Sequence, residues 1–216
     1  MATYSISRSF KWQGTITERV AAVCRMFGLT TDRLAEERFT RCCKVDINAG
    51  DIIYITGPSG AGKSILLSEL EECIPAADRV NLANIELPSD KTLVDCFDGD
   101  WLMSLRLLSV AGLSDCFTVL NQPSHLSAGQ QYRFRMAMAL AAGRKFVFAD
   151  EFCSGLDSIS ALVLAYGLHK FARQSGTTFI LASSRSDIIL DLAPDALVET
   201  EQCGQAEVIY KRTRRR

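Results

Sequence analysis

Residues 57–64 read Gly-Pro-Ser-Gly-Ala-Gly-Lys-Ser, in which two glycines, a lysine and the last serine stand at the fixed spacing G-x-x-x-x-G-K-S. The segment lies between an apolar run at 52–56 and a helical pattern that begins at Ile65. Glycines let the backbone wrap so that its N–H groups converge on phosphate oxygens, and the following helix adds the positive end of its dipole. We expect Lys63 to reach the β and γ phosphates of ATP. The expected nucleotide contacts are Gly57, Pro58, Ser59, Gly60, Ala61, Gly62, Lys63, Ser64 and Ile65.

A serine and two acids supply the oxygen ligands that Mg²⁺ prefers. Ser64 ends the glycine-rich segment, and Asp150 and Glu151 directly follow the apolar run 146–149. Because parallel strands end at the same edge of a sheet, these side chains are expected to converge. We expect Ser64 and Asp150 to hold Mg²⁺ and Glu151 to polarise the water that attacks the γ-phosphate. Lys63 and Glu151 are thus the predicted catalytic residues; the alternative is that the two acids simply end a strand at the surface.

A third motif, residues 126–131, reads Leu-Ser-Ala-Gly-Gln-Gln and precedes a helical stretch. A small turn that opens a helix presents a hydroxyl, unpaired N–H groups and a positive dipole end to an anion. Together with the two motifs above, the segment resembles the LSGGQ signature of the ABC ATPase family, with Ala128 as its one departure. Residues 154–157, Ser-Gly-Leu-Asp, are similar to the D-loop of that family. The resemblance covers roughly residues 40 to 200.

The resemblance implies that two cassettes stack head to tail around two ATP molecules. A homodimer is therefore expected. Ser127, Gly129 and Gln130 would face the γ-phosphate held by the second copy, and Asp157 would lie at the interface. The phosphate site alone is shared with small-molecule kinases, GTPases and ring ATPases, so the signature segment decides the family.

Two further positions depart from the pattern of the family. No glutamine occurs between Ser64 and Leu120, and Glu86 is the nearest substitute for the Q-loop glutamine, either as a Mg²⁺ ligand or as a solvated acid. Arg185 stands where the switch histidine belongs. A guanidinium there can bind the γ-phosphate as a permanent cation but cannot carry a proton, so we expect Arg185 at the catalytic site and slow or partner-dependent hydrolysis.

The adenine base should stack on an aromatic side chain that precedes the phosphate loop. Phe10, Trp12 and Phe39 are the candidates, and each could equally be a packing residue. Trp12 is favoured because its neighbours Lys11 and Gln13 are polar.

The elements that position these residues alternate between short apolar runs and helical stretches, which is typical of an α/β fold with a mainly parallel sheet flanked by helices. Strands are predicted at 51–56, 145–149, 177–182 and 196–198, and helices at 63–73, 127–142 and 158–174. We expect one P-loop NTPase domain of ABC type over residues 1–216. Its parts are an N-terminal extension at 1–40, a nucleotide-binding core at 41–91 and 143–210, a short helical subdomain at 92–142, and a basic tail at 211–216. The extension should contain a strand around 4–12 and a helix around 17–27.

Composition excludes several classes of function. The 216 residues carry a net charge of −1, so no overall field favours nucleic acid; a solvated basic tail is preferred over nucleic-acid contact. Eight cysteines form no C-x-x-C pair, which argues against zinc or a redox dithiol and favours mostly buried thiols. No apolar run of the roughly 18 residues needed for a span and no secretory signal is present, so a cytoplasmic protein is expected.

Three functions remain open. One is a soluble, atypical ATPase that acts on a macromolecular or enzyme partner, and the segment 150–153 resembles the acetyltransferase-linked branch of the family. A second is the ATP-binding subunit of a membrane transporter, peripheral to the inner membrane and bound to a membrane subunit. The third is a nucleotide-dependent switch with weak hydrolysis. The short helical region and the missing glutamine favour the first.

Overall fold

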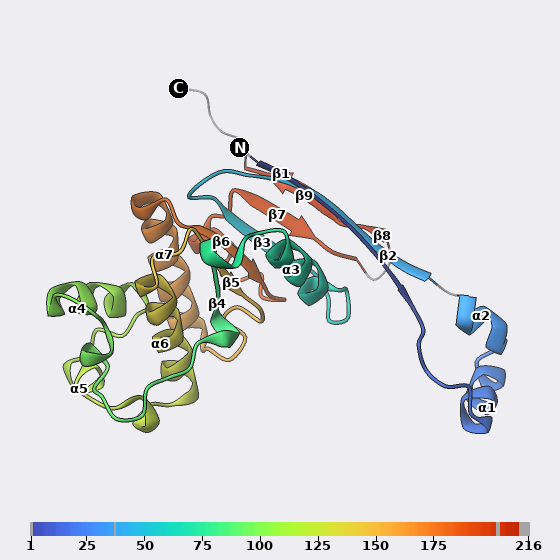
Figure 1. The fold of residues 1–216 in the computed structure, drawn as a ribbon, viewed down its shortest axis with the longest axis horizontal. Helices are drawn as coiled ribbons and strands as arrows, with labels where there is room; N and C mark the ends of the chain where they lie inside the picture. The colour runs from blue at the N-terminus through green and yellow to red at the C-terminus, as the bar shows by residue number, and fades with distance from the viewer. Residues whose placement is uncertain (1, 37, 202–203, 212–216) are drawn as a thin grey trace.

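The computed structural model describes residues 2–36, 38–201 and 204–211, leaving aside the side chains of residues 10, 38–41, 204 and 205. A six-stranded sheet with the order β4-β5-β6-β3-β7-β9 forms its centre, and a smaller sheet, β1-β2-β8, lies beside it (Figure 1). The strands are β1 Ala2–Lys11, β2 Arg38–Ile47, β3 Ile52–Thr56, β4 Arg79–Asn81, β5 Phe146–Ala149, β6 Thr178–Ala182, β7 Ala196–Glu199, β8 Gly204–Gln205 and β9 Glu207–Tyr210. The helices are α1 Glu18–Met26, α2 Thr31–Glu36, α3 Lys63–Glu72, α4 Trp101–Val110, α5 Cys116–Val119, α6 Ala128–Ala141, α7 Ser158–Ser175 and α8 Ile189–Leu192, with short 3-10 turns at Ala76–Asp78, Leu82–Asn84, Val94–Cys96 and Pro123–His125.

The central sheet is parallel from β4 to β7, and only β9 runs antiparallel at its edge. All side chains of β6 and the first four of β3 are buried, as continuous apolar runs covered on both faces should be. Alternate residues of β3 serve two cores: Ile52 and Tyr54 pack with α6 and α7, whereas Ile53 and Ile55 pack with α3 and the β1-β2 sheet. The expected α/β fold with a mainly parallel sheet flanked by helices is confirmed.

One continuous core joins the sheet to the helical region that was expected at 92–142. Leu107 and Leu108 of α4, Phe134 of α6 and Val147 of β5 belong to the same buried cluster. Gly167 of α7 permits this packing, since a Cβ there would lie 2.2 Å from the main-chain oxygen of Val110 at the end of α4.

The N-terminal segment forms an arm. Strands β1 and β2 pair antiparallel from Ala2 with Ile47 to Lys11 with Arg38, and α1 and α2 lie at the far end of this ribbon, away from the central sheet (Figure 1). The helix expected at 17–27 is present as α1, and Thr17 caps it by accepting a hydrogen bond from Val20 N. Its apolar residues do not form a buried face: Val23 is 53% and Phe27 69% exposed.

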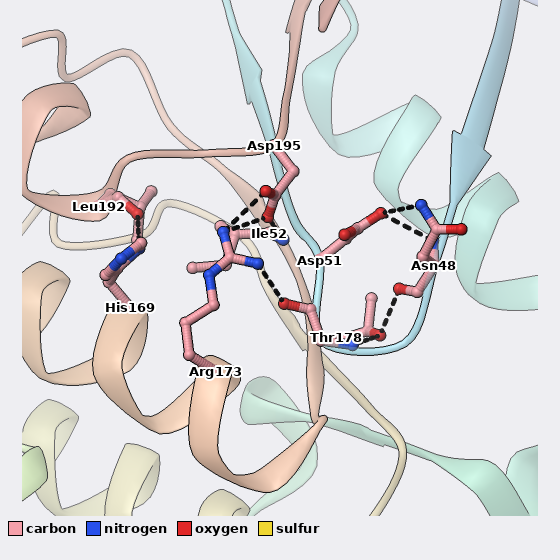
Figure 2. A network of polar contacts seen from close by, with 9 residues as sticks. Asn48, Asp51, Ile52, His169, Arg173, Thr178, Leu192 and Asp195 are labelled. Carbon is pink, nitrogen blue, oxygen red and sulfur yellow. Dashed lines mark hydrogen bonds and ion pairs between the residues drawn. The ribbon is translucent and has the colours of Figure 1, made fainter. Parts of the chain in front are cut away.

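A polar network lies at the amino-terminal ends of β3, β6 and β7 (Figure 2). This side of the central sheet is opposite the carboxyl ends of the same strands. Arg173 of α7 donates from Nη2 to both carboxylate oxygens of Asp195, at 2.7 and 2.9 Å. Asp195 also accepts from Ile52 N at 2.9 Å, and Thr178 donates from Oγ1 to the main-chain oxygen of Asn48. The network therefore fixes the register of β3, β6 and β7 beneath α7.

The cysteines depart from expectation. All seven that the structure describes are unbridged, but only Cys24, Cys43 and Cys153 are buried, while Cys73 and Cys116 are exposed; Cys203 lies outside the described residues. The prediction of mostly buried thiols was therefore wrong, because small side chains in helix-terminal segments such as 73 and 116 stay at the surface. In the part of the chain that the structure covers, no helix is both long and apolar enough to cross a membrane.

Candidate active site

A hollow of about 510 Å³ at the carboxyl ends of β3, β5 and β6 gathers most of the predicted phosphate-site residues. This is the edge where the ends of parallel strands meet and where ligands bind in open α/β sheets. Its lining residues are Ser59, Gly60, Gly62, Lys63, Ser64, Ile65, Asp150, Glu151, Ser154, Ala182, Ser183, Ser184 and Arg185.

The glycine-rich loop joins β3 to α3. Gly57 must be glycine, because a Cβ would lie 2.2 Å from the main-chain oxygen of Thr200. Lys63 donates from Nζ to the main-chain oxygens of Gly57 and Pro58, both at 2.9 Å. The ammonium is thus held over its own loop by two neutral acceptors, which anionic phosphate oxygens can replace with stronger, charge-assisted bonds.

The two acids leave β5 through a strained turn. Glu151 has a φ of 47° and Cys153 a φ of 60°, both in the left-handed region that non-glycine residues rarely adopt. Phe152 between them is fully buried, and its N–H donates to the main-chain oxygen of Ala182 at 2.8 Å. Asp150 and Glu151 are exposed and line the hollow, so the buried phenyl ring anchors a turn that presents both carboxylates to the phosphate loop.

Glu86 lies at a second hollow, of about 420 Å³, which it shares with Tyr132, Arg135 and Asp150. Asp150 is the residue that both hollows have in common. Among the described residues no group of three or more histidine, cysteine, aspartate or glutamate side chains could hold a metal ion. Ser64 and Asp150 offer the hard oxygen donors that Mg²⁺ takes alongside phosphate oxygens, so the residues present fit that ion; the part of Glu86 stays a prediction.

The signature segment caps α6 and does not line the phosphate hollow. Gln130 N donates to Ser127 Oγ at 3.3 Å, while Ser127 N donates to Gln130 Oε1 at 2.9 Å, a reciprocal capping box. Ser127 is exposed, and a Cβ on Gly129 would lie 3.1 Å from the side chain of Leu156. The signature therefore packs against the loop 153–158 of its own chain and keeps its serine at the surface.

Asp157 caps the next helix. Its carboxylate accepts from Ser160 N at 2.9 Å at the start of α7, and this bond lowers the pKa of Asp157. The side chain of Asp157 is exposed, as a residue at a dimer interface would be in the single chain. Its place at that interface stays a prediction.

Trp12 lies partly exposed at the end of β1 and is not among the residues that line the phosphate hollow. Its ring lies over Gly14, where a Cβ would come within 2.3 Å of the indole. The side chains of Phe10 and Phe39 are outside the described residues. Stacking of adenine on one of the three aromatics stays a prediction.

Two tyrosines beneath the site, the fully buried Tyr54 and the partly buried Tyr132, were not anticipated. Tyr54 of β3 donates from its hydroxyl to the main-chain oxygen of Arg185 at 2.6 Å, and Tyr132 of α6 accepts from Cys153 N at 3.2 Å. Burial raises the pKa of Tyr54 and of the Cys153 thiol to about 12 each, and it raises the pKa of Tyr132. A tyrosine in a wholly apolar strand is the sequence feature that indicates such a contact, because a buried hydroxyl needs a partner.

Comparison with known proteins agrees with this geometry, although no family model matches the chain. The methionine import ATP-binding protein MetN of Streptococcus agalactiae (strain NEM316) is 29% identical in an alignment over 191 residues that covers 69% of this chain and 52% of that protein. An uncharacterized ABC transporter ATP-binding protein of Methanocaldococcus jannaschii, MJ1508, is 29% identical over 66% of this chain and 79% of its own length. The chain thus spans about half the length of the MetN relatives it matches.

Solved structures share the fold at low identity. The dimeric post-hydrolysis structure of the ATP-binding cassette MJ0796 with ADP and Pi has a TM-score of 0.62 at 20% identity and covers 82% of this chain and 94% of its own. CbiO1 from Clostridium perfringens, part of the ABC transporter complex cbiONQ, has a TM-score of 0.59 at 19% identity, covering 76% and 78%. In its fold, in the order of the four motifs on it and in these relatives, the chain is similar to ABC-type ATP-binding cassettes.

Proposed function

We propose that this chain binds ATP with Mg²⁺ and hydrolyses it as one of a head-to-tail pair of cassettes that drive a membrane transporter. The observation that carries the proposal is the convergence of Lys63, Ser64, Asp150 and Glu151 on one hollow from two separate segments of the chain. The dimeric form of the MJ0796 structures supports the pairing, in which Ser127, Gly129 and Gln130 would meet the nucleotide of the second copy.

Each residue has a distinct part in the proposed reaction. Lys63 exchanges its two main-chain acceptors for β and γ phosphate oxygens and neutralises their charge. Glu151 accepts a proton from the water that attacks the γ-phosphorus, while the bond to the β–γ bridging oxygen breaks and leaves ADP. Ser64 and Asp150 would hold Mg²⁺, which supplies further neutralisation of the phosphate charge when bound.

The relatives favour a transporter over a soluble partner, since MetN is a methionine import ATP-binding protein and MJ1508 an ABC transporter ATP-binding protein. A transporter cassette would lie against the membrane through a membrane subunit. None of the relatives given above is an acetyltransferase-linked protein, so resemblance to that branch stays without support from them. A soluble ATPase and a weakly hydrolysing switch remain alternatives, because Glu86 stands near the position of the Q-loop glutamine and Arg185 at that of the switch histidine. A nucleic-acid partner would rest on the basic tail, whose residues 212–216 lie outside the described part of the chain.

Phosphate release and oligomeric state test the proposed activity. Glu151→Gln should abolish release of phosphate from ATP and make the chain elute as a dimer when Mg²⁺ and ATP are present, because closure no longer ends in hydrolysis. Glu72→Gln, an exposed glutamate at the end of α3, is the matched control and should behave as the wild type. Lys63→Ala should weaken ATP binding by at least about tenfold. Unchanged ATP affinity in Lys63→Ala would refute the assigned site.

Co-purification of the Glu151→Gln chain from solubilised membranes and from the soluble fraction tests the partner. A multispanning protein bound only in the presence of ATP supports the transporter. A soluble protein or nucleic acid bound in the same way supports the alternative and contradicts the transporter.

A further inference from the structure

One side chain ties the segment after β6 to the loop 153–158 that follows the two acids. Arg185 donates from Nη1 to the main-chain oxygens of Cys153 at 3.0 Å and Leu156 at 2.6 Å. Its Nη2 donates to Ser158 Oγ at 3.4 Å. These three acceptors lie 27 to 32 positions away in sequence, so the contact joins two separate loops across the end of the sheet.

The rest of the guanidinium is taken up by Asp187. Nε donates to Oδ1 at 3.0 Å and Nη2 to Oδ2 at 2.5 Å, the planar fork that an arginine and a carboxylate form. This pairing lowers the pKa of Asp187. A guanidinium carries five N–H donors. Two on Cys153 and Leu156, one on Ser158 and two on Asp187 occupy all five, so none remains for a phosphate oxygen in this arrangement.

The backbone of Arg185 is fixed as well. Its carbonyl oxygen accepts from the Tyr54 hydroxyl at 2.6 Å, and its N–H donates to Ser183 Oγ at 3.3 Å. Tyr54 and Ser183 are both buried. Arg185 is therefore anchored to the central sheet at its main chain and to the loop 153–158 at its side-chain end.

The geometry points to Arg185 as a positioning residue that holds the loop 153–158, rather than as a cation that contacts the γ-phosphate. The inference deepens the proposed function, on which it rests. Glu151 precedes this loop by two residues and Asp157 lies within it, so the clamp sets both the water-activating carboxylate and the segment that meets the second cassette. Loss of the clamp should disturb hydrolysis in the dimer far more than binding of ATP.

The first test needs no nucleotide. Cys153 is fully buried within the held loop, so its thiol reacts with a maleimide only when the loop opens. Peptide mass mapping measures the rate at which Cys153 is labelled. Arg185→Gln should raise this rate by at least about tenfold, because three hydrogen bonds to the loop are lost. Arg185→Lys should fail to restore protection, since an ammonium cannot span two carbonyls and a carboxylate at once. Arg106→Gln, an exposed arginine on α4, is the matched control and should label as the wild type.

The second test separates positioning from phosphate contact. In Arg185→Gln the affinity for ATP should stay within about twofold while kcat for phosphate release falls at least about tenfold. A phosphate-binding cation predicts the reverse: ATP affinity drops in Arg185→Gln and returns in Arg185→Lys. That outcome, or wild-type labelling of Cys153 in Arg185→Gln, overturns the inference. If the wild type binds no ATP, the proposed function fails, and the labelling rate of Cys153 still decides whether Arg185 clamps the loop.

Discussion

Phe134 offers a quantitative test of whether the helical region and the sheet unfold together. The side chain is fully buried in α6, and its ring meets that of Phe97 edge to face at 6.0 Å between centroids. Its cluster includes Leu108 of α4 and Val147 of β5, so the ring belongs to the core that joins helical region and sheet.

Phe134→Ala should lower the free energy of unfolding by about 3–5 kcal/mol, from lost apolar burial and the cavity left behind. At about 2–4 °C per kcal/mol for a chain of this size, the melting temperature should fall by roughly 6–20 °C. Phe117→Ala removes the same side chain where it is 85% exposed and should change stability by less than about 0.5 kcal/mol. Phe134→Leu keeps most of the volume and should cost only about 1–2 kcal/mol.

Urea unfolding followed both by tryptophan fluorescence and by far-ultraviolet circular dichroism provides the measurement. The chain has two tryptophans, Trp12 and Trp101, so the experiment uses a Trp12→Phe background. Trp101 begins α4, and the fluorescence of that background therefore reports on the helical region while circular dichroism averages over the chain. The two transitions should coincide in the wild type and shift together in Phe134→Ala. Two separated transitions, of which only the fluorescence one shifts, would refute the single shared core and the single domain expected from the sequence.

Three further outcomes are expected. Gly57→Ala should abolish ATP binding and lower the free energy of unfolding by about 2 kcal/mol or more, because the added methyl group would lie 2.2 Å from the main-chain oxygen of Thr200. Isothermal titration measures the binding and thermal melts the stability. Retained binding would contradict the close approach. Asp195→Ala should cost about 2 kcal/mol in urea, since a strand amide and Arg173 both lose their acceptor; the part due to the ion pair should shrink at 1 M salt, a concentration at which charges are screened within about 3 Å. Stability should also fall as pH rises from about 9 to 12, because burial raises the pKa of Cys43 to about 11 and of Tyr54 to about 12, so the folded chain keeps protons that the unfolded chain releases near 9 and 10. A urea midpoint that stays constant from about pH 9 to 12 would count against this reasoning. So would a Tyr54→Phe chain whose urea midpoint falls with pH as steeply as that of the wild type.

Local pattern was sufficient for the central sheet and the phosphate site. The apolar runs at 51–56 and 177–182 match β3 and β6 within one residue at each end, because a strand buried on both faces must be apolar throughout. Ser64 and Asp150 could be placed together in advance, since the strands before them are parallel and end at one edge. β2 was not predicted, although Cys43, Val45 and Ile47 alternate inward along it, because polar residues between them mask the run.

The contacts of Arg185 lay beyond sequence reasoning. Alignment to the family placed it at the histidine position, which suggests a phosphate ligand, but its acceptors are main-chain oxygens and carry no signature in side-chain type. The periodicity of apolar residues also does not indicate which residues an apolar face contacts. Helix α1 was predicted from its 3.6-residue repeat, yet that repeat does not show whether Val23 and Phe27 are covered by other residues. Pattern predicts elements, and long-range polar geometry has to be observed.

The arm formed by β1, β2, α1 and α2 has a consequence for how this cassette can vary. Between residues 12 and 36, Cys24 is the one buried side chain, so the tip contributes little to the two cores that hold the sheet. Residues there can be inserted, removed or exchanged with small effect on global folding, as at other exposed hairpin tips. Local opening of the tip should therefore be independent of global unfolding, which leaves this segment open to sequence change while the phosphate site stays constrained.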